Sequence, residues 1–115
     1  MHKHTLENEI SYVLEGELSV VQDGEVQIAR PGEFIVKPQE IFHTFCNAGD
    51  KIVRFREIIT PGNCEYYFSE LAPFLLKGQP PKMDKVRETS HKYGLIVDPD
   101  AASDIIAKYG LKTLL

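Results

Sequence analysis

The sequence predicts a mainly β domain followed by a helical tail. Up to Pro61-Gly62 it consists of short runs rich in β-forming residues, and residues typical of turns separate each run from the next. No helical periodicity interrupts these runs, which is typical of an antiparallel sandwich or barrel. After Pro61 the apolar residues recur at three- and four-residue spacings, which indicates helices. We therefore expect a β-barrel over residues 1–62 and a helical extension over residues 63–115 that packs on it.

Turn residues set the bounds of the expected strands. Asp23-Gly24 is the clearest signal, because both central residues of a tight hairpin turn must tolerate a positive φ. Pro31-Gly32, Pro38 and residues 47–50 mark the later turns. The strands are expected at residues 10–14, 18–22, 25–30, 34–36, 41–46 and 51–60.

Three helices are expected in the tail. The first covers residues 63–77, with Asn63 as the N-cap and Gly78 as the C-terminal stop. Its apolar stripe has to be buried, so we expect this helix to lie on the barrel. The others are expected at residues 82–93, ending at Gly94, and at residues 100–109, ending at Gly110.

Length, charge and composition narrow the classes of protein. A chain of 115 residues suits one domain. The net charge is −4 and there is no basic run, which argues against a nucleic-acid partner. No apolar stretch approaches the roughly 20 residues that span a bilayer, and the first residues lack the apolar core of a signal peptide. We therefore expect a cytoplasmic protein with no membrane partner. Cys46 and Cys64 could pair, but in a reduced cytosol we expect free thiols without a catalytic role.

The residues that suggest chemistry begin with His2-x-His4. Residues two apart on a strand point to the same side, so both rings can face one point inside a barrel. Glu9 follows after a short segment, and His43 lies on a later strand that could pack opposite. Three imidazoles and one carboxylate suit a divalent transition metal such as Mn, Fe, Co, Ni, Cu or Zn, and leave a position for substrate. A chance His-x-His pair in a chain with four histidines is the alternative.

The last expected strand offers a further candidate. Its more apolar face should line the barrel and comprises Val53, Phe55, Glu57 and Ile59. Glu57 would then be a general acid or base in an apolar pocket, or, as the alternative, the ion-pair partner of an arginine near the rim. Arg54 and Arg56, on the other face, should be solvated or in surface ion pairs. Three phenylalanines either line a ligand pocket or belong to the core: Phe34, Phe45 and Phe55.

Two motifs of this chain resemble those of the cupin superfamily. The family's first motif is His-x-His, three or four residues, Glu, six residues and Gly; it stands here as His2-Lys3-His4, Glu9 and Gly16. Its second motif is Gly, five residues, Pro-x-Gly, two residues, His, three residues and Asn; it reads here as Gly32, Pro38, Glu40, His43 and Asn47. The strand at residues 52–59 also looks like the family.

The resemblance implies a jelly-roll barrel and a metal bound by His2, His4, Glu9 and His43. The helical tail is similar to that of small single-domain bacterial cupins, some of them labelled quercetin dioxygenase-like. This likeness implies a metal-dependent dioxygenase acting on a small organic molecule, with Glu9 or Glu57 moving a proton. The alternatives are a non-catalytic barrel that binds or senses a small ligand, and a barrel whose metal site is degraded.

Two departures from the family pattern give further expectations. Glu40 replaces a turn glycine, and a positive φ there would cost about 1 kcal/mol or more, so this turn should have another shape. Family members also place a strand before the first histidine, whereas this chain begins at the motif. The edge of the first strand then needs a cover, and we expect a homodimer in which a partner chain supplies it. The tail folding back over this edge is the alternative.

Overall fold

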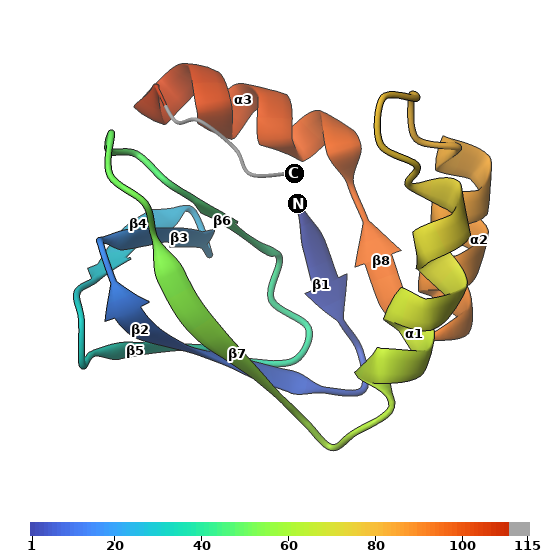
Figure 1. The fold of residues 1–115 in the computed structure, drawn as a ribbon, viewed down its shortest axis with the longest axis horizontal. Coiled ribbons are helices and arrows are strands. Elements are labelled where there is room, and N and C mark those ends of the chain that lie inside the picture. Colours follow the sequence, from blue (N-terminus) through green and yellow to red (C-terminus); the bar gives the residue numbers. More distant parts are fainter. Residues whose placement is uncertain (111–115) are drawn as a thin grey trace.

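The computed structural model describes residues 1–110 and shows a mainly β protein built from two antiparallel sheets (Figure 1). The larger sheet has the strand order β4-β3-β6-β1-β8, and the smaller has the order β5-β2-β7. The strands are β1 (His2–His4), β2 (Asn8–Glu15), β3 (Leu18–Gln22), β4 (Glu25–Ala29), β5 (Phe34–Lys37), β6 (His43–Cys46), β7 (Arg54–Thr60) and β8 (Leu95–Val97). The helices are α1 (Cys64–Leu71), the 3₁₀ turn η1 (Ala72–Phe74), α2 (Met83–Lys92) and α3 (Pro99–Tyr109). None of these described helices is long and apolar enough to cross a membrane.

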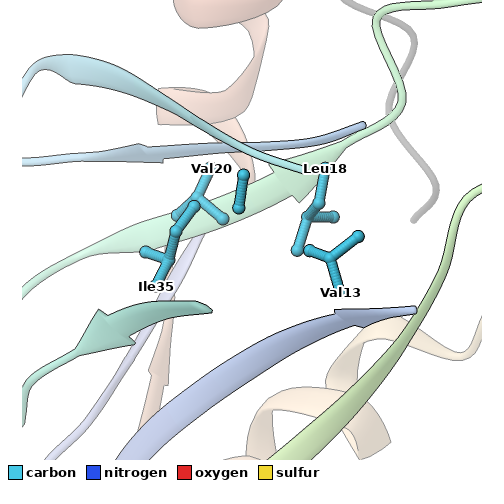
Figure 2. Close-up of a cluster of buried hydrophobic side chains, with 5 residues drawn as sticks. Val13, Leu18, Val20 and Ile35 are labelled. Carbon is cyan, nitrogen blue, oxygen red and sulfur yellow. The ribbon is translucent and has the colours of Figure 1, made fainter. Parts of the chain in front are cut away.

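The main hydrophobic core lies between the two sheets. Figure 2 shows Val13 and Ile35 of the smaller sheet facing Leu18 and Val20 of the larger one. Burying apolar side chains from both layers is the main stabilising term in such a fold.

Two of the three phenylalanines belong to this core. Phe45 and Phe55 pack against it and against each other, with ring centroids 5.4 Å apart. Phe34 was a candidate for an interior pocket, but it lies on the outer face of the smaller sheet and is 63% exposed. It follows β-strand alternation, since its neighbour Ile35 takes the inward position.

Two turns with a positive φ at a non-glycine residue test the sequence predictions, and one prediction is confirmed while the other is wrong. The Asp-Gly hairpin is confirmed, because Asp23 and Gly24 have φ angles of 51° and 75° between β3 and β4. The expectation for Glu40 is wrong, because its φ is 67°. Its amide donates to the carbonyl of His4 at 2.8 Å, and its carboxylate pairs with Lys3 at 2.8 Å. These contacts with β1 offset a strain of about 1 kcal/mol and tie the turn to the first histidine motif.

The first tail helix is shorter than the sequence pattern predicts. It begins at Cys64 and ends at Leu71, and the chain continues as the turn η1. Pro73 explains the difference, because it has no amide hydrogen to donate and its ring obstructs the preceding helical turn. Asn63 occupies the N-cap position with a φ of 101°, but its side chain makes no capping hydrogen bond.

The tail packs on the β region through a second hydrophobic cluster. This cluster joins α1, α2 and β8 to Ile59 of β7, and its buried members are Cys64, Tyr67, Leu71, Val86 and Leu95. The helices α2 and α3 lie within one or two residues of their predicted bounds. Asp98 caps α3 by accepting from the amides of Asp100 and Ala101. Residues 111–115 of the expected tail lie outside the described part of the chain.

Strand β8 was not predicted, and it covers the open edge of β1. The two strands pair antiparallel, with Lys3 opposite Ile96. Thr5 donates to the carbonyl of Gly94 at one end, and Asp98 donates to that of Met1 at the other. The edge that was expected to need a partner chain is therefore covered by the chain's own tail, as in the alternative given above, and the homodimer itself stays a prediction.

A proline at Ile96 tests the structural role of β8. Ile96 is exposed, so its side chain contributes little to the core, but Ile96→Pro removes a backbone amide from the middle of the strand. We expect this variant to lower the free energy of unfolding by about 3 kcal/mol. The matched control Ile96→Thr keeps both the amide and a β-branched side chain, and should change it by less than about 0.5 kcal/mol. Denaturant unfolding measures both, and equal stabilities would show that β8 is dispensable.

Candidate metal site

The four histidine and glutamate candidates converge between the two sheets. His2 and His4 lie two residues apart on β1, and His43 lies opposite His2 on the neighbouring β6. Glu9 reaches the same point from β2 of the other sheet. One potential ligand atom from each residue lies within 4.8 Å of those of the others. Ligands bound to a common ion at about 2.1 Å lie about 3.0–4.2 Å apart, so a small contraction would bring all four into coordination.

Hydrogen bonds orient two of the imidazoles toward this point. His43 Nδ1 lies 3.2 Å from the carbonyl oxygen of Ile41, which can only accept, so Nδ1 carries the hydrogen and Nε2 presents a lone pair. His4 Nδ1 lies 3.0 Å from the carboxylate of Glu7, which fixes the same tautomer. A histidine that donates one ring N–H to a carboxylate or carbonyl is the usual arrangement of a metal ligand. Glu7 is buried and was missed by the sequence reasoning, because nothing in its spacing distinguishes it from a solvated turn residue.

The nitrogen and oxygen atoms at the centre of the site are better satisfied by a shared metal ion than by hydrogen bonds to one another. His4 Nε2 lies 2.9 Å from one oxygen of Glu9, and His43 Nε2 lies 2.7 Å from the other. These are ion-pair distances, yet within the described residues both nitrogens and Glu9 Oε2 are buried without a hydrogen-bond partner. Buried polar atoms without partners are rare and call for an explanation. A shared cation would satisfy all of them.

The pKa shifts of His2 and Glu9 favour binding of a cation by the cluster. Burial lowers the pKa of His2 to about 3, with His43 adding to the effect, so this ring is neutral at pH 7 with a lone pair free to bind. Burial alone would raise the pKa of Glu9, but the contacts with His4 and His43 and the charge of Lys37 hold it well below its usual range. Burial would lower the pKa of His4, but Glu9 and Glu7 outweigh it and raise this pKa. A metal at His4 therefore competes with a proton for this ring, and binding should release protons.

A buried lysine extends the site along the inner face of the smaller sheet. Lys37 of β5 has a fully buried side chain, and its Nζ lies 3.2 Å from Glu9 and 2.7 Å from Glu57. Glu57 also accepts a hydrogen bond of 2.8 Å from the hydroxyl of Ser11. Strand register explains the arrangement, because Glu9 lies opposite Lys37 and Ser11 lies opposite Glu57. The result is a continuous polar row leading away from the four candidate ligands.

Glu57 faces the interior, but its surroundings differ from both alternatives considered for it. It is neither isolated in an apolar pocket nor paired with an arginine, because its partner is Lys37. Arg54 and Arg56 are exposed on the opposite face. Alternation along β5 could have identified Lys37, since it shares the inward face with Ile35.

The two cysteines play no part in the cluster. Cys46 and Cys64 are free and buried, as expected. Burial raises the pKa of the Cys64 thiol to about 12, so it stays protonated and is a poor nucleophile or metal ligand at neutral pH.

Comparisons with known proteins agree on the fold. Residues 1–59, slightly more than half of the chain, match the family model described as a cupin domain. Among solved structures the chain is similar to one titled "The structure of KdgF from Halomonas sp.", with a TM-score of 0.50 and 22% sequence identity. That match covers 57% of this chain and 60% of the other, and at this identity it concerns the fold alone. No curated protein matches this chain.

Replacing His43 tests the metal site most simply. We expect the purified protein to hold about one divalent transition metal per chain. His43→Ala should lose this metal, because the three remaining ligands bind it far more weakly than four. His91→Ala is the matched control, since this histidine lies exposed on α2, away from the cluster. Elemental analysis of untagged protein reports both. Retention of the metal by His43→Ala would show that the site lies elsewhere.

Glu7 should tune metal affinity without touching the metal. Glu7→Ala removes the acceptor that orients His4, and we expect it to weaken binding about 10–100-fold. Glu7→Gln keeps an acceptor oxygen and should have a smaller effect. Glu88→Ala, an exposed carboxylate on α2, is the control. Competition with a chromogenic chelator gives the affinities, and an unchanged value in Glu7→Ala would remove Glu7 from the site.

Proposed function

This chain belongs to the cupin superfamily, and from that premise we propose that it is a metal-dependent enzyme acting on a small organic molecule, with dioxygenase as the favoured reaction class. We also propose that the two sheets form the jelly-roll barrel of the family, and that the chain is one of its quercetin dioxygenase-like members. The observation that supports it best is the convergence of three imidazoles and Glu9 between the sheets, with buried donor atoms that lack partners. His2, His4, Glu9 and His43 would hold the ion.

A divalent transition metal supplies Lewis-acid activation and, for a redox-active ion, one-electron chemistry. Four protein ligands leave one or two coordination positions for a substrate in a five- or six-coordinate site. Softer thiolate ligands are absent from the cluster, so Fe, Mn, Co, Ni, Cu and Zn all suit its nitrogen and oxygen donors.

Glu57 is the better placed of the two carboxylates proposed for proton transfer. Both oxygens of Glu9 already face histidines, and Lys37 contacts it as well. Glu57 lies one step further along the polar row, and its side chain is 23% exposed. Lys37 and the Ser11 hydroxyl each hold one of its oxygens, which fixes its orientation. We therefore assign Glu57 the role of taking a proton from an acidic hydroxyl of the substrate.

A non-catalytic barrel that binds a small ligand is the second candidate. The restricted access to the site favours it, because His4, Glu9 and His43 are all at most 5% exposed and only His2 is half-buried. In such a protein the metal would grip a carboxylate or hydroxyl of the ligand without converting it. Turnover distinguishes the two candidates.

Oxygen uptake by metal-loaded protein tests the proposal. We expect the Fe- or Mn-loaded protein to consume O₂ when flavonols or catechols are added. Glu57→Gln should lower the rate about 10²–10⁴-fold while leaving the metal content unchanged, because it removes the proton acceptor and not a ligand. Glu88→Gln, at an exposed position on α2, should behave as the parent protein.

Two results would contradict parts of this account. Binding of small ligands without O₂ uptake for any of the metals named above would favour the non-catalytic candidate. A full rate in Glu57→Gln would leave the enzyme in place and remove Glu57 from the chemistry.

A further inference from the structure

One buried polar atom without a partner lies outside the four candidate metal ligands. Within the described residues, His4, Glu9 and His43 account for three such atoms, and the fourth is Oε1 of Gln22. Gln22 lies at the end of β3 and is only 8% exposed. A buried acceptor with no donor is unfavourable, so Gln22 Oε1 calls for an explanation as much as the ligand atoms do.

Strand register places Gln22 beside the candidate metal site. On β3, Leu18 and Val20 point into the space between the sheets (Figure 2), and alternation gives Gln22 the same direction. Gln22 lies opposite His43 on β6, and His43 lies opposite His2 on β1. The Cβ atoms of directly opposed residues are about 4.5–5.5 Å apart. Gln22 therefore continues a row that already contains two of the four candidate ligands.

Hydrogen bonds fix the orientation of the Gln22 amide. Its Nε2 donates to the carbonyl of Val36 on β5 and to Oε1 of Gln27 on β4, each at 3.0 Å. The Val36 carbonyl can only accept, so the amide cannot turn round without bringing two acceptor oxygens together. Both amide hydrogens are used, and Oε1 remains a fixed acceptor. Val36 precedes Lys37, whose Nζ lies 3.2 Å from Glu9, so the amide reaches the other sheet on the Lys37 side of the cluster.

We propose that Gln22 makes the site selective for small molecules that carry two hydroxyl oxygens on neighbouring atoms, such as catechols and other vicinal diols. One oxygen of the ligand binds at an open position of the metal, and the neighbouring hydroxyl donates a hydrogen bond to Gln22 Oε1. Oxygens on neighbouring atoms suit the short separation of Gln22 and His43. A hydroxyl satisfies the acceptor, whereas an ether or carboxylate oxygen at the same place leaves it unpaired. The inference rests on the metal site of the proposed function and not on turnover.

A purely structural role for Gln22 predicts a different outcome. The two hydrogen bonds of Nε2 already join β3 to β4 and β5, and this support of the fold is the same for every ligand. A hydrogen bond from the ligand to Oε1 affects only molecules that carry the second hydroxyl. Sites that hydrogen-bond a substrate hydroxyl discriminate strongly against analogues that lack it. The selectivity between two ligands therefore separates the two roles.

Calorimetric titration of the zinc-loaded protein with catechol and with phenol tests the role of Gln22. Zinc is redox-inactive, so both ligands bind without turnover. Gln22→Met keeps the length of the side chain but offers only a weak acceptor. It should lower the affinity for catechol about tenfold and change that for phenol less than about twofold. Gln27→Leu is the matched control, because it removes one partner of Nε2, leaves Oε1 in place and should keep the parent's preference for catechol.

A comparison on the parent protein alone covers the case in which Gln22→Met misfolds. 2-Methoxyphenol keeps both oxygens of catechol but has lost one donor, and it should bind about tenfold more weakly. The proposal would be overturned by failure of catechol to bind, by an unchanged affinity of Gln22→Met for catechol, or by an equal loss for catechol and phenol. Similar binding of catechol and 2-methoxyphenol by the parent would overturn it as well. The expected selectivity in a protein that consumes no O₂ would support the proposal and count against the dioxygenase alone.

Discussion

Glu9 is an ionised carboxylate buried between two sheets, and much of the surrounding structure compensates for its charge. An isolated buried carboxylate would be strongly unfavourable, and the chain brings Lys37, His4 and His43 within 3.2 Å of it. Lys37 in turn has a fully buried ammonium, which needs the second carboxylate of Glu57. The polar row therefore arises from one constraint, and a divalent cation among the imidazoles would extend the same compensation.

The polar row has a consequence for the outside of the protein. A three-stranded sheet that gives inner positions to Glu9, Lys37 and Glu57 can bury fewer apolar residues against the main core. Its remaining apolar residues alternate to the outer face, where no described element covers them. The inner site and the exposed apolar residues of the outer face thus lie on two sides of one sheet, as strand alternation places them.

The candidate ligands depend on elements far from them in the sequence. His2 and His4 lie on a strand of only three residues, which is too short to keep its position without a neighbour on each side. β6 provides one neighbour and β8, more than ninety residues away, provides the other. Hydrogen bonds from Thr5 and Asp98 hold the two ends. The tail therefore positions the imidazoles as well as covering the β region.

The features that local physics decides were predictable, and those that depend on distant contacts were not. Alternation on a strand placed His2 and His4 together, and the positive φ required by a hairpin identified Asp23-Gly24. Pro73 could also have been recognised as a helix breaker, but the apolar spacing of residues 63–77 favoured one longer helix. The strand β8 has only three residues, so no period could show it, and its partner is set by tertiary contacts. The prediction for the turn at Glu40 was wrong for the same reason, since contacts with Lys3 and His4 offset its local strain.

X-ray absorption at the metal edge tests the central claim most directly, because it reports the atoms that surround the ion. We expect a first shell of nitrogen and oxygen at about 2.0–2.2 Å, with outer-shell scattering from three imidazoles. A shell containing sulfur at about 2.3 Å, or scattering from fewer than three imidazoles, would contradict a site built from His2, His4, Glu9 and His43.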